Sequence, residues 1–268
     1  MLERKNIQNK KYILGQFFTP KHICEQLISN IDFTDALIIE PSFGTGNFIA
    51  SLKFLSNKKI GVELDEELFS DSLIDKNTTL LNKNFYDFSI KSAKKLIFIG
   101  NPPYRTPAYS LTTHKDFISK ITKKYNVMGI REEAVFFILH TIDIIRTNNT
   151  SGEIHYIVPM SLLKNNSKFY TRFKEFLKEQ CHFANITSLK GPEFEGVSQD
   201  LIILSLHVRP STDTARQETE GLVSNNQKFV SVDGQKVLLD EYLCLKDTDS
   251  IPFQKIFKPN TTKFGVGG

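Results

Sequence analysis

Leu96-Ile97-Phe98-Ile99-Gly100-Asn101-Pro102-Pro103-Tyr104 is the stretch of sequence that decides both the fold and the chemistry expected of this chain. A short apolar run bounded by a glycine and two prolines indicates a strand that is buried in a sheet. The turn that follows combines an amide side chain, two stiff prolines and an aromatic ring. An amide oxygen and a main-chain oxygen can each accept one N–H of a planar amino group, while the aromatic ring stacks on the ring that carries it. The stretch therefore predicts a buried strand that ends in a site for methylating an exocyclic or amide nitrogen.

Strands and helices alternate along the rest of the chain. Apolar runs predict strands at 36–40, 59–63, 78–82, 96–99, 154–158, 183–189 and 201–208, and amphipathic segments predict helices at 20–28, 47–55, 65–73, 113–124, 132–146 and 167–179. This alternation indicates a parallel sheet with helices on both faces, and the last two strands, which have no helix between them, should pair antiparallel. The expected fold is α/β, a doubly wound, mostly parallel, seven-stranded sheet of the Rossmann-like class with a C-terminal antiparallel hairpin. Ligands of such sheets bind beyond the carboxyl ends of the strands, near the point where the strand order reverses.

The composition argues against several classes of protein. The chain has 268 residues with no apolar stretch of 18 residues, so no membrane span is expected. Its three cysteines, Cys24, Cys181 and Cys244, are odd in number and far apart, and its six histidines lack ligand spacing. We therefore expect no metal, and a reduced, cytoplasmic environment. The net charge of +4 permits a nucleic-acid partner without requiring one.

One stretch of the chain concentrates positive charge. It contains Lys164, Lys168, Arg172, Lys174, Lys178 and Lys190, diluted only by Glu175 and Glu179. A helix face of this kind could bind phosphates. The same pattern is equally typical of a solvated helix with ion pairs between successive turns.

A turn with two glycines follows the first predicted strand. It reads Glu40-Pro41-Ser42-Phe43-Gly44-Thr45-Gly46, and its glycines allow the backbone to turn tightly and to approach a ligand. Glu40 ends the first predicted strand, and Glu63 ends the second. The carboxylate of Glu63 can accept hydrogen bonds from both hydroxyls of a ribose. Asp87, after the third strand, could accept from an adenine amino group, or it could simply cap a short helix.

The chemistry of this turn restricts the kinds of ligand that it could bind. The turn lacks the third glycine of a dinucleotide-binding fingerprint, and it has no lysine for a phosphate. Acids and main-chain amides suit instead a ligand with positive charge, an amino group and a ribose but no pyrophosphate. S-adenosylmethionine is such a ligand, and we predict it as the cofactor.

Five segments, taken in order, resemble the motifs of amino-group DNA methyltransferases. They are Gln16-Phe17-Phe18-Thr19-Pro20, the turn from Glu40 through Phe48, Gly61-Val62-Glu63-Leu64-Asp65, Asn84-Phe85-Tyr86-Asp87-Phe88, and Gly100 through Tyr104. A Thr-Pro segment before the cofactor turn and a catalytic motif after it is similar to the gamma class of N6-adenine-specific DNA methyltransferases, which are typical of restriction–modification systems. The resemblance covers about residues 10–210, and it implies double-stranded DNA as the partner.

The resemblance implies roles for single residues. Those that match cofactor-contacting positions are Thr19, Glu40, Glu63 and Asp87, with Ser42 at the methionine end and Pro103 against the cofactor. Asn101 and Pro102 would accept the two N–H groups of an adenine flipped out of the duplex and stabilise the positive charge that grows on its nitrogen. Tyr104 and Phe194 would stack on the two faces of that base. Because asparagine is not a general base, proton loss would follow methyl transfer.

Other interpretations of the same motif stay open. Asn-Pro-Pro-Tyr also occurs in enzymes that methylate a glutamine amide in release factors, and similar tetrapeptides occur in ribosomal RNA methyltransferases. Cytosine N4 is a further target, although that class more often begins the motif with serine. The alternative without catalysis is a specificity or scaffold subunit that retains only the fold.

The composition changes after Arg209-Pro210. Residues 211–227 are polar and indicate a linker, and residues 228–245 alternate around Asp233-Gly234, which predicts a hairpin. We therefore divide the chain into a catalytic domain at 1–210, and a linker with the start of a truncated target-recognition region at 211–268. Gamma-class enzymes usually carry a full region of that kind, so recognition of a DNA sequence would depend on a domain or subunit missing from this chain.

Overall fold

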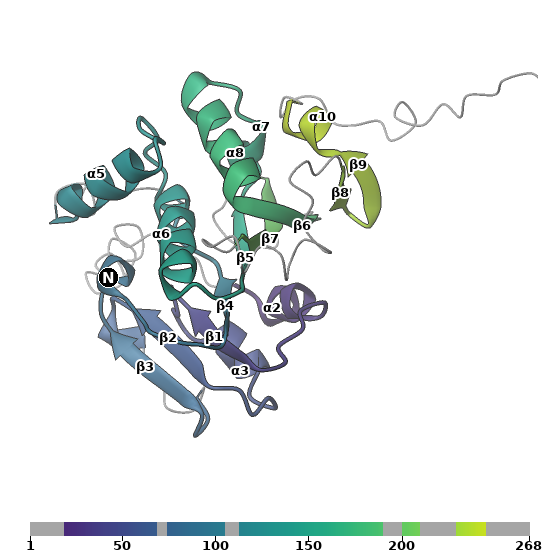
Figure 1. Ribbon diagram of the computed structural model, residues 1–268. Helices are drawn as coiled ribbons and strands as arrows, with labels where there is room; N and C mark the ends of the chain where they lie inside the picture. Colours follow the sequence, from purple (N-terminus) through teal and green to yellow (C-terminus); the bar gives the residue numbers. More distant parts are fainter. Residues whose placement is uncertain (1–18, 69–73, 105–112, 190–199, 210–228, 245–268) are drawn as a thin grey trace, which may run out of the picture.

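The chain folds around one mixed sheet with helices on both faces. The computed structural model describes residues 19–68, 74–104, 113–189, 200–209 and 229–244 (Figure 1). The strands of the described sheet follow the order β3-β2-β1-β4-β5-β7-β6-β8-β9. Their bounds are β1 Ala36–Glu40, β2 Lys59–Glu63, β3 Thr78–Asn82, β4 Lys95–Gly100, β5 Gly152–Pro159, β6 Cys181–Leu189, β7 Leu201–Val208, β8 Phe229–Val232 and β9 Gln235–Leu238. All seven predicted strands are present, within two residues at each end.

The sheet has its switch point between β1 and β4. The strands β1 to β5 run parallel, and β7 pairs antiparallel with both β5 and β6. The chain builds outward from β1 through β2 to β3, and then returns to the other side of β1 as β4. The predicted doubly wound fold with late antiparallel strands is therefore confirmed, and the loops after β1 and β4 emerge side by side at the carboxyl edge.

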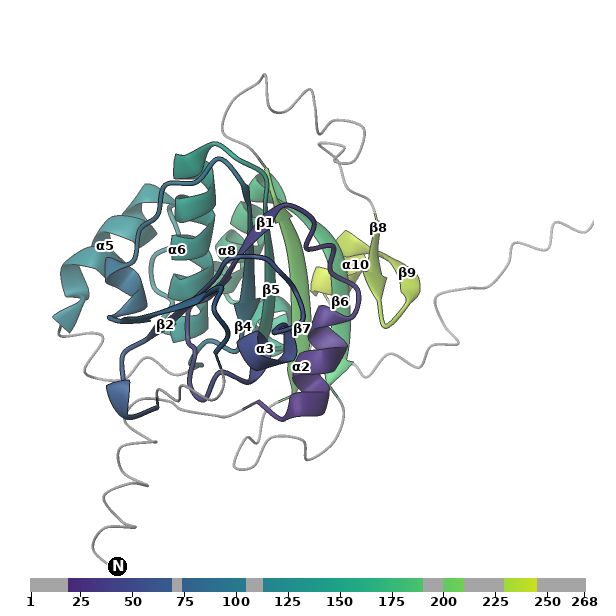
Figure 2. The same cartoon turned by 90° about the horizontal axis from the view of Figure 1, so that it is seen from below.

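Helices cover the two faces unequally. One face packs against α2 (Lys21–Ile28) and α3 (Asn47–Ser51), and the other against α6 (Glu133–Asn148) and α8 (Lys168–Gln180), with α5 (Lys115–Lys124) outside α6 (Figure 2). Most residues of α6 are buried, because this helix lies between the sheet and α5. No helix in the described ranges is long and apolar enough to cross a lipid bilayer.

Three helical segments differ from the prediction. The helix predicted at 47–55 ends at Ser51, because the chain turns back so that the Asn57 amide can donate to the carbonyls of Phe33 and Ala36 at the start of β1. In place of a helix at 65–73, the described part forms a single 3-10 turn, η1 (Glu66–Leu68), and residues 69–73 lie outside the described ranges. A short helix, α7 (Ser161–Lys164), was not predicted, since four residues leave no periodic pattern.

The hairpin β8–β9 extends the sheet beyond the seven predicted strands. Asp233 and Gly234 both have positive φ, 49° and 81°, which is the two-residue turn that the sequence predicted. β8 pairs in parallel with β6. The Asp233 carboxylate also accepts from the main-chain N–H of Ser188 at 2.6 Å and from its hydroxyl at 2.8 Å. The described part of 211–268 is thus joined to the same sheet as residues 19–209, while the predicted linker at 211–227 lies outside the described residues.

Lysines of the positively charged stretch bind the last described helix, α10 (Leu239–Cys244). The ammonium group of Lys164 donates to the carbonyl of Tyr242, and that of Lys174 donates to the carbonyl of Leu243 at 2.7 Å. Lys178 pairs with Asp240 at 2.5 Å. Cations at the carboxyl end of a helix satisfy its free carbonyl groups. The prediction of a phosphate-binding face is wrong for these three lysines, because their ammonium groups are bound within the chain.

The remaining members of that stretch fit the alternative interpretation or stay untested. Arg172 pairs with Glu175 and Glu179 on the same helix, each at 3.3 Å, as expected for a solvated helix face. Lys168 is exposed, and Lys190 lies outside the described residues. The cysteines also differ in environment, since Cys24 and Cys181 are buried and Cys244 is exposed.

A buried ion network on β5 gives the fold a testable pH dependence. Glu153 lies 2.6 Å from Lys95 and 2.9 Å from His155. Burial opposes ionisation of this carboxyl, but the hydrogen bonds of His155 and Lys95 prevail and lower its pKa from 4.5 to about 2. Between these two values the unfolded chain binds the proton and the folded chain does not. The pair therefore stabilises the fold fully above about pH 4.5, and that stability is lost as the pH falls toward 2.

We expect Glu153→Gln to remove part of this dependence. Urea unfolding between pH 3 and pH 6 should show a shallower loss of unfolding free energy with acidity in the variant than in the wild type, by about 1–2 kcal/mol after solvent screening. Glu25→Gln is the control, because Glu25 forms only an exposed pair with Lys21 at 3.5 Å. Equal pH slopes for Glu153→Gln and the wild type would contradict the assignment.

Candidate active site

Two loops meet at the switch point and form the candidate site. The loop after β1 begins at Pro41, and the loop after β4 begins at Asn101. The hydroxyl of Ser42 donates to the main-chain carbonyl of Asn101 at 3.1 Å. Gly100 has φ +149°, and a Cβ on it would lie 3.7–3.8 Å from atoms of Glu40, Pro41 and Ser42. The predicted cofactor turn and the predicted methylation motif are therefore in direct contact.

An aromatic side chain supports the cofactor turn from beneath. The ring of Phe43 is 2% exposed and lies against Gly46 and Gly61, so that a Cβ on Gly46 would be 2.2 Å from its Cζ. Gly46 also has φ +77°, in the left-handed region that disfavours other residues. The sequence prediction credited this glycine with close approach to a ligand, whereas the structure adds a packing reason. The role of Phe43 was missed, although an aromatic residue directly before the two glycines of a turn is a signal that could have indicated it.

The two predicted strand-end acids lie at this turn and are both buried enough to perturb their ionisation. Glu40 is 1% exposed and accepts from the main-chain N–H of Ile49 at 3.2 Å. Burial raises the pKa of Glu40 well above its ordinary value. Burial also raises the pKa of Glu63, against the opposing hydrogen bonds from Asp65 and Gly44. Two carboxyl groups of this kind favour a ligand that brings positive charge and hydrogen-bond donors.

Glu63 keeps acceptor capacity for a ligand. Its Oε2 accepts from the N–H of Gly44 at 2.8 Å, and its Oε1 accepts from the N–H of Asp65 at 2.9 Å. A carboxylate has about four lone-pair positions, so each oxygen can accept one further hydrogen bond. The two hydroxyls of a ribose are donors that suit those positions.

The Thr-Pro segment lies beside the same turn. Thr19 is 6% exposed, and its carbonyl accepts from the side-chain amide of Asn47 at 2.8 Å. Asn47 begins α3, directly after the glycine turn. The sequence prediction gave Asn47 no role of its own, yet this residue joins the Thr-Pro segment to the cofactor turn.

Asp87 lies at the carboxyl edge beyond β3. It belongs to the short 3-10 turn η3 (Phe85–Asp87), and it is exposed. The N-cap of that turn is Asn84, whose side chain accepts from the N–H of Tyr86 at 2.9 Å. The alternative that Asp87 acts as a helix cap is therefore wrong, and its carboxylate is placed at the edge where a ligand could reach it.

Asn101 and Tyr104 are bonded to each other. The Tyr104 hydroxyl donates to Oδ1 of Asn101 at 2.5 Å. The Tyr104 ring is 4% exposed and packs in the apolar cluster that includes Ile99, Ile157 and Ile203. Burial raises the pKa of the Tyr104 hydroxyl, which therefore stays protonated as a donor. A stacking residue needs an open ring face, so stacking by Tyr104 requires this ring to leave the position described here.

The space at the site is small compared with the predicted cofactor. A cavity of about 30 Å³ opens between the two loops, lined by Thr19, Glu40, Ser42, Phe43, Gly44, Thr45, Asn47, Phe48 and Asn101. Ligand pockets usually have about 300–1,000 Å³. The chemistry of the residues present fits S-adenosylmethionine. Pro103, two residues after Asn101 in the chain, is half-buried. Phe194 lies outside the described residues.

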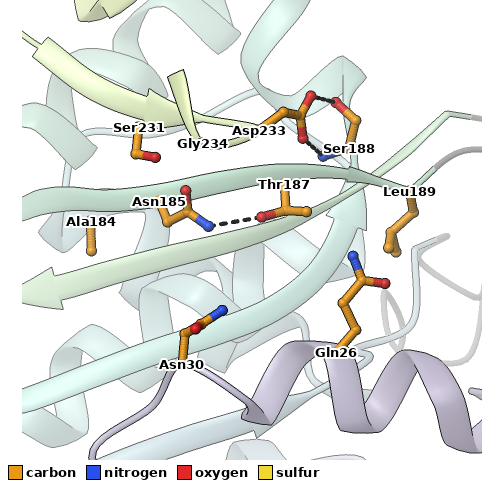
Figure 3. Close-up of a pocket in the computed structure, with 10 residues that line it drawn as sticks. All are labelled: Gln26, Asn30, Ala184, Asn185, Thr187, Ser188, Leu189, Ser231, Asp233 and Gly234. Atoms are coloured by element: carbon orange, nitrogen blue, oxygen red, sulfur yellow. Dashed lines mark hydrogen bonds between the residues drawn. The ribbon is translucent and has the colours of Figure 1, made fainter. Parts of the chain in front are cut away.

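A larger cavity, of about 760 Å³, lies elsewhere (Figure 3). It separates α2 from β6 and the β8–β9 turn, with Gln26 and Asn30 on one side and Asn185, Thr187 and Ser188 on the other. None of the predicted site residues lines it, and no lysine, arginine or histidine is among its described lining residues. Its size alone does not make it the active site, because neither the predicted cofactor turn nor the predicted methylation motif lines it.

Comparisons with known proteins agree with this placement. A family model described as Eco57I restriction-modification methylase matches residues 46–194, which is more than half of the chain. The Type II methyltransferase M.CvrRI of Paramecium bursaria Chlorella virus XZ-6E is 28% identical over 216 residues, covering 78% of this chain and 50% of that relative. The Type II methyltransferase M.HincII of Haemophilus influenzae is 28% identical over 200 residues, covering 73% of this chain and 38% of that relative.

The fold has matches among solved structures. A protein of Listeria monocytogenes described as a class I S-adenosylmethionine-dependent methyltransferase superposes with a TM-score of 0.54 at 18% identity, covering 79% of this chain and 61% of that chain. The present chain spans half or less of the length of the curated relatives named above. The predicted cofactor, S-adenosylmethionine, is confirmed at the level of family and fold. The chain belongs to the Eco57I restriction-modification methylase family.

Proposed function

We propose that this chain transfers a methyl group from S-adenosylmethionine to the N6 amino group of an adenine that is flipped out of a specific DNA sequence, as the modification activity of a restriction–modification system. The observation that carries the proposal is the hydrogen bond between Ser42 and Asn101. It places the turn after β4, whose oxygens could accept from an amine, directly beside the acidic turn after β1, which could bind a positively charged ligand. The Type II methyltransferases named above support DNA as the substrate.

Each end of the cofactor has residues of matching chemistry. Glu63 would hold the ribose hydroxyls through its remaining lone pairs, and Asp87 would accept from the adenine amino group. The positive amino-acid end would lie toward Glu40 and Thr19. The residues that would line the rest of the cofactor are Ser42, Gly44, Gly46 and Pro103. S-adenosylmethionine supplies an electrophilic methyl group on a positively charged sulfur.

The protein would activate the amine by hydrogen bonding rather than by removing a proton first. The lone pair of adenine N6 is delocalised into the ring. Asn101 Oδ1 and the Pro102 carbonyl would each accept one N–H, which draws the nitrogen toward a tetrahedral geometry and stabilises its growing positive charge. Asn101 Oδ1 now accepts from the Tyr104 hydroxyl, and its second lone pair could accept the N–H of the amine, while movement of the Tyr104 ring would free the first.

The target base must leave the duplex, because its N6 atom is not accessible there. Release of Tyr104 from Asn101 would free its ring to stack on the extruded adenine, and Phe194 would cover the opposite face. Under this proposal, Tyr104 leaves Asn101 when the substrate base enters the site.

Sequence recognition belongs to residues outside those described. We place the described hairpin β8–β9 and α10 with the catalytic fold, because they pair with β6 and bind α7 and α8. The catalytic domain predicted at 1–210 would therefore extend through the described residues 229–244, and the target-recognition region predicted within 211–268 would lie outside them. A further domain or a partner subunit would read the DNA sequence.

Product analysis tests the proposed function directly. The chain is incubated with methyl-labelled S-adenosylmethionine and, in parallel reactions, genomic DNA, ribosomal RNA or a release factor, and each product is digested to nucleosides or amino acids. Label in N6-methyladenine supports the proposal, and label in N4-methylcytosine contradicts the adenine assignment. Label found instead in ribosomal RNA or in a release-factor glutamine, with none in DNA, supports one of the alternative enzymes that share this motif.

We expect Glu63→Gln to weaken cofactor binding by about 10- to 100-fold, since hydrogen bonds to a charged group contribute about 1.5–3 kcal/mol. The substitution keeps the shape of the side chain but removes its charge and one acceptor. Calorimetric titration of S-adenosylmethionine measures the effect. Glu66→Gln is the matched control, because Glu66 is exposed in η1, three residues further along the chain. An unchanged dissociation constant for Glu63→Gln would remove this residue from the cofactor site.

A further inference from the structure

We infer that Ser42 is a positioning residue for methyl transfer: its hydroxyl holds the main-chain carbonyl of Asn101 and so sets the direction of both amine acceptors relative to the cofactor turn. The sequence placed Ser42 only at the methionine end of the cofactor. The structure directs its hydroxyl to Asn101 O at 3.1 Å, across 59 residues of sequence. The inference rests on the proposed function.

The motif itself offers few main-chain donors for anchoring. Between Gly100 and Tyr104 the chain contains two consecutive prolines, Pro102 and Pro103, which have no N–H. β4 ends at Gly100, so Asn101 begins the loop that follows the strand. A donor from outside the segment is therefore the direct way to fix the first peptide of the turn, and the Ser42 hydroxyl is such a donor.

Fixing that one carbonyl constrains both acceptors. The Asn101 carbonyl belongs to the planar peptide that joins Asn101 to Pro102. The orientation of this plane sets the Asn101 backbone from which Oδ1 projects. Because the φ of Pro102 is locked near −65°, the same plane also restricts where the Pro102 carbonyl can point. One hydrogen bond thus orients two oxygen atoms.

The Tyr104 bond makes this anchor more important when the substrate binds. In the structure Asn101 is held at its carbonyl by Ser42 and at its side chain by Tyr104. Under the proposed function the Tyr104 contact is given up to the incoming amine. The Ser42 contact, which involves a different oxygen, can persist through the reaction.

Kinetic analysis separates positioning from cofactor binding. We expect Ser42→Ala to lower kcat by about 3- to 10-fold, the loss of one ordinary hydrogen bond, with the dissociation constant of S-adenosylmethionine changed by less than about twofold. Ser42→Thr keeps the hydroxyl and should recover most of the rate. Ser29→Ala is the control, because Ser29 donates to the carbonyl of Gln26 at 2.9 Å at the exposed end of α2. A wild-type kcat in Ser42→Ala, or a loss confined to cofactor affinity, overturns the inference.

Hydrogen exchange tests the same inference without turnover. In the free chain we expect the amides of Gly100, Asn101 and Tyr104 to exchange about 3- to 10-fold faster in Ser42→Ala than in the wild type, with Ser42→Thr and Ser29→Ala unchanged. Unchanged protection in Ser42→Ala overturns the inference even if the enzyme is active. Failure of the wild type to methylate DNA, with the expected exchange pattern intact, contradicts the proposed function instead.

Discussion

Asn101→Ala is expected to lower kcat for methyl transfer by about 100- to 1,000-fold or more, the range measured when a single preorganised hydrogen-bonding partner of a transition state is removed. The variant loses the side-chain oxygen that would accept one N–H of the target amine. Cofactor affinity should change by less than about twofold, because the acids that we propose to contact the cofactor are untouched. Single-turnover assays with labelled S-adenosylmethionine, together with calorimetry of cofactor binding, measure both quantities.

Asn165→Ala provides the matched control for this variant. Its side chain accepts from the N–H of Ser167 at 2.9 Å between α7 and α8, away from the two loops of the site. The same amide is removed in both variants, so a comparable rate loss would indicate a general effect on folding. Near-wild-type methylation by Asn101→Ala would show that the proposed amine-binding mechanism is wrong.

Gly46→Ala is expected to destabilise the fold by roughly 3 kcal/mol, which corresponds to a fall in Tm of about 6–12 °C for a chain of this size. Two penalties add. A side chain at φ +77° is strained, and its Cβ would lie 2.2 Å from Cζ of the buried Phe43 ring. The ring cannot move away easily, because it also lies against Gly61, where a Cβ would be 2.5 Å from the ring. Thermal unfolding followed by circular dichroism measures the change.

Gly234→Ala separates the two penalties. Gly234 has a similar φ, +81°, but a Cβ on it would meet no atom within 4 Å. We expect a cost of about 1 kcal/mol there, from backbone strain alone. If Gly46→Ala and Gly234→Ala lower Tm equally, the packing of Phe43 under the turn does not contribute as described.

The strands β1, β2 and β4 were predictable because each is a short, largely apolar run that lies inside the sheet. Ala36–Glu40 and Lys59–Glu63 were located to the residue. The addition of β8 to β6 was not predictable in the same way. It depends on long-range interactions, among them the bond from the main-chain N–H of Ser188 to Asp233, and no local pattern predicts a pairing between segments 45 residues apart.

The candidate site was predictable in its membership but not in its contacts. The acids at the ends of β1 and β2 and the motif after β4 meet at one edge, as parallel strands require. The burial of Tyr104 was not foreseen, because an aromatic ring beside a binding turn is equally suited to stacking and to packing. The bond of its hydroxyl to Asn101 decides the matter for the free chain. The stretch from Lys164 to Lys178 shows the same limit, since charge alone does not distinguish phosphates from helix carbonyls.

The hydrogen bonds from Lys164 and Lys174 to the carbonyl groups of α10 have a practical consequence. It fixes the main chain as far as Cys244, whose carbonyl accepts from the Asn166 amide at 3.0 Å. Cys244 is also the exposed thiol, whereas burial raises the pKa of Cys181 to about 12 and that of Cys24 further still. A maleimide dye will therefore attach at a single, immobile position. Energy transfer between that dye and labelled duplexes would measure the distance from the end of α10 to bound nucleic acid.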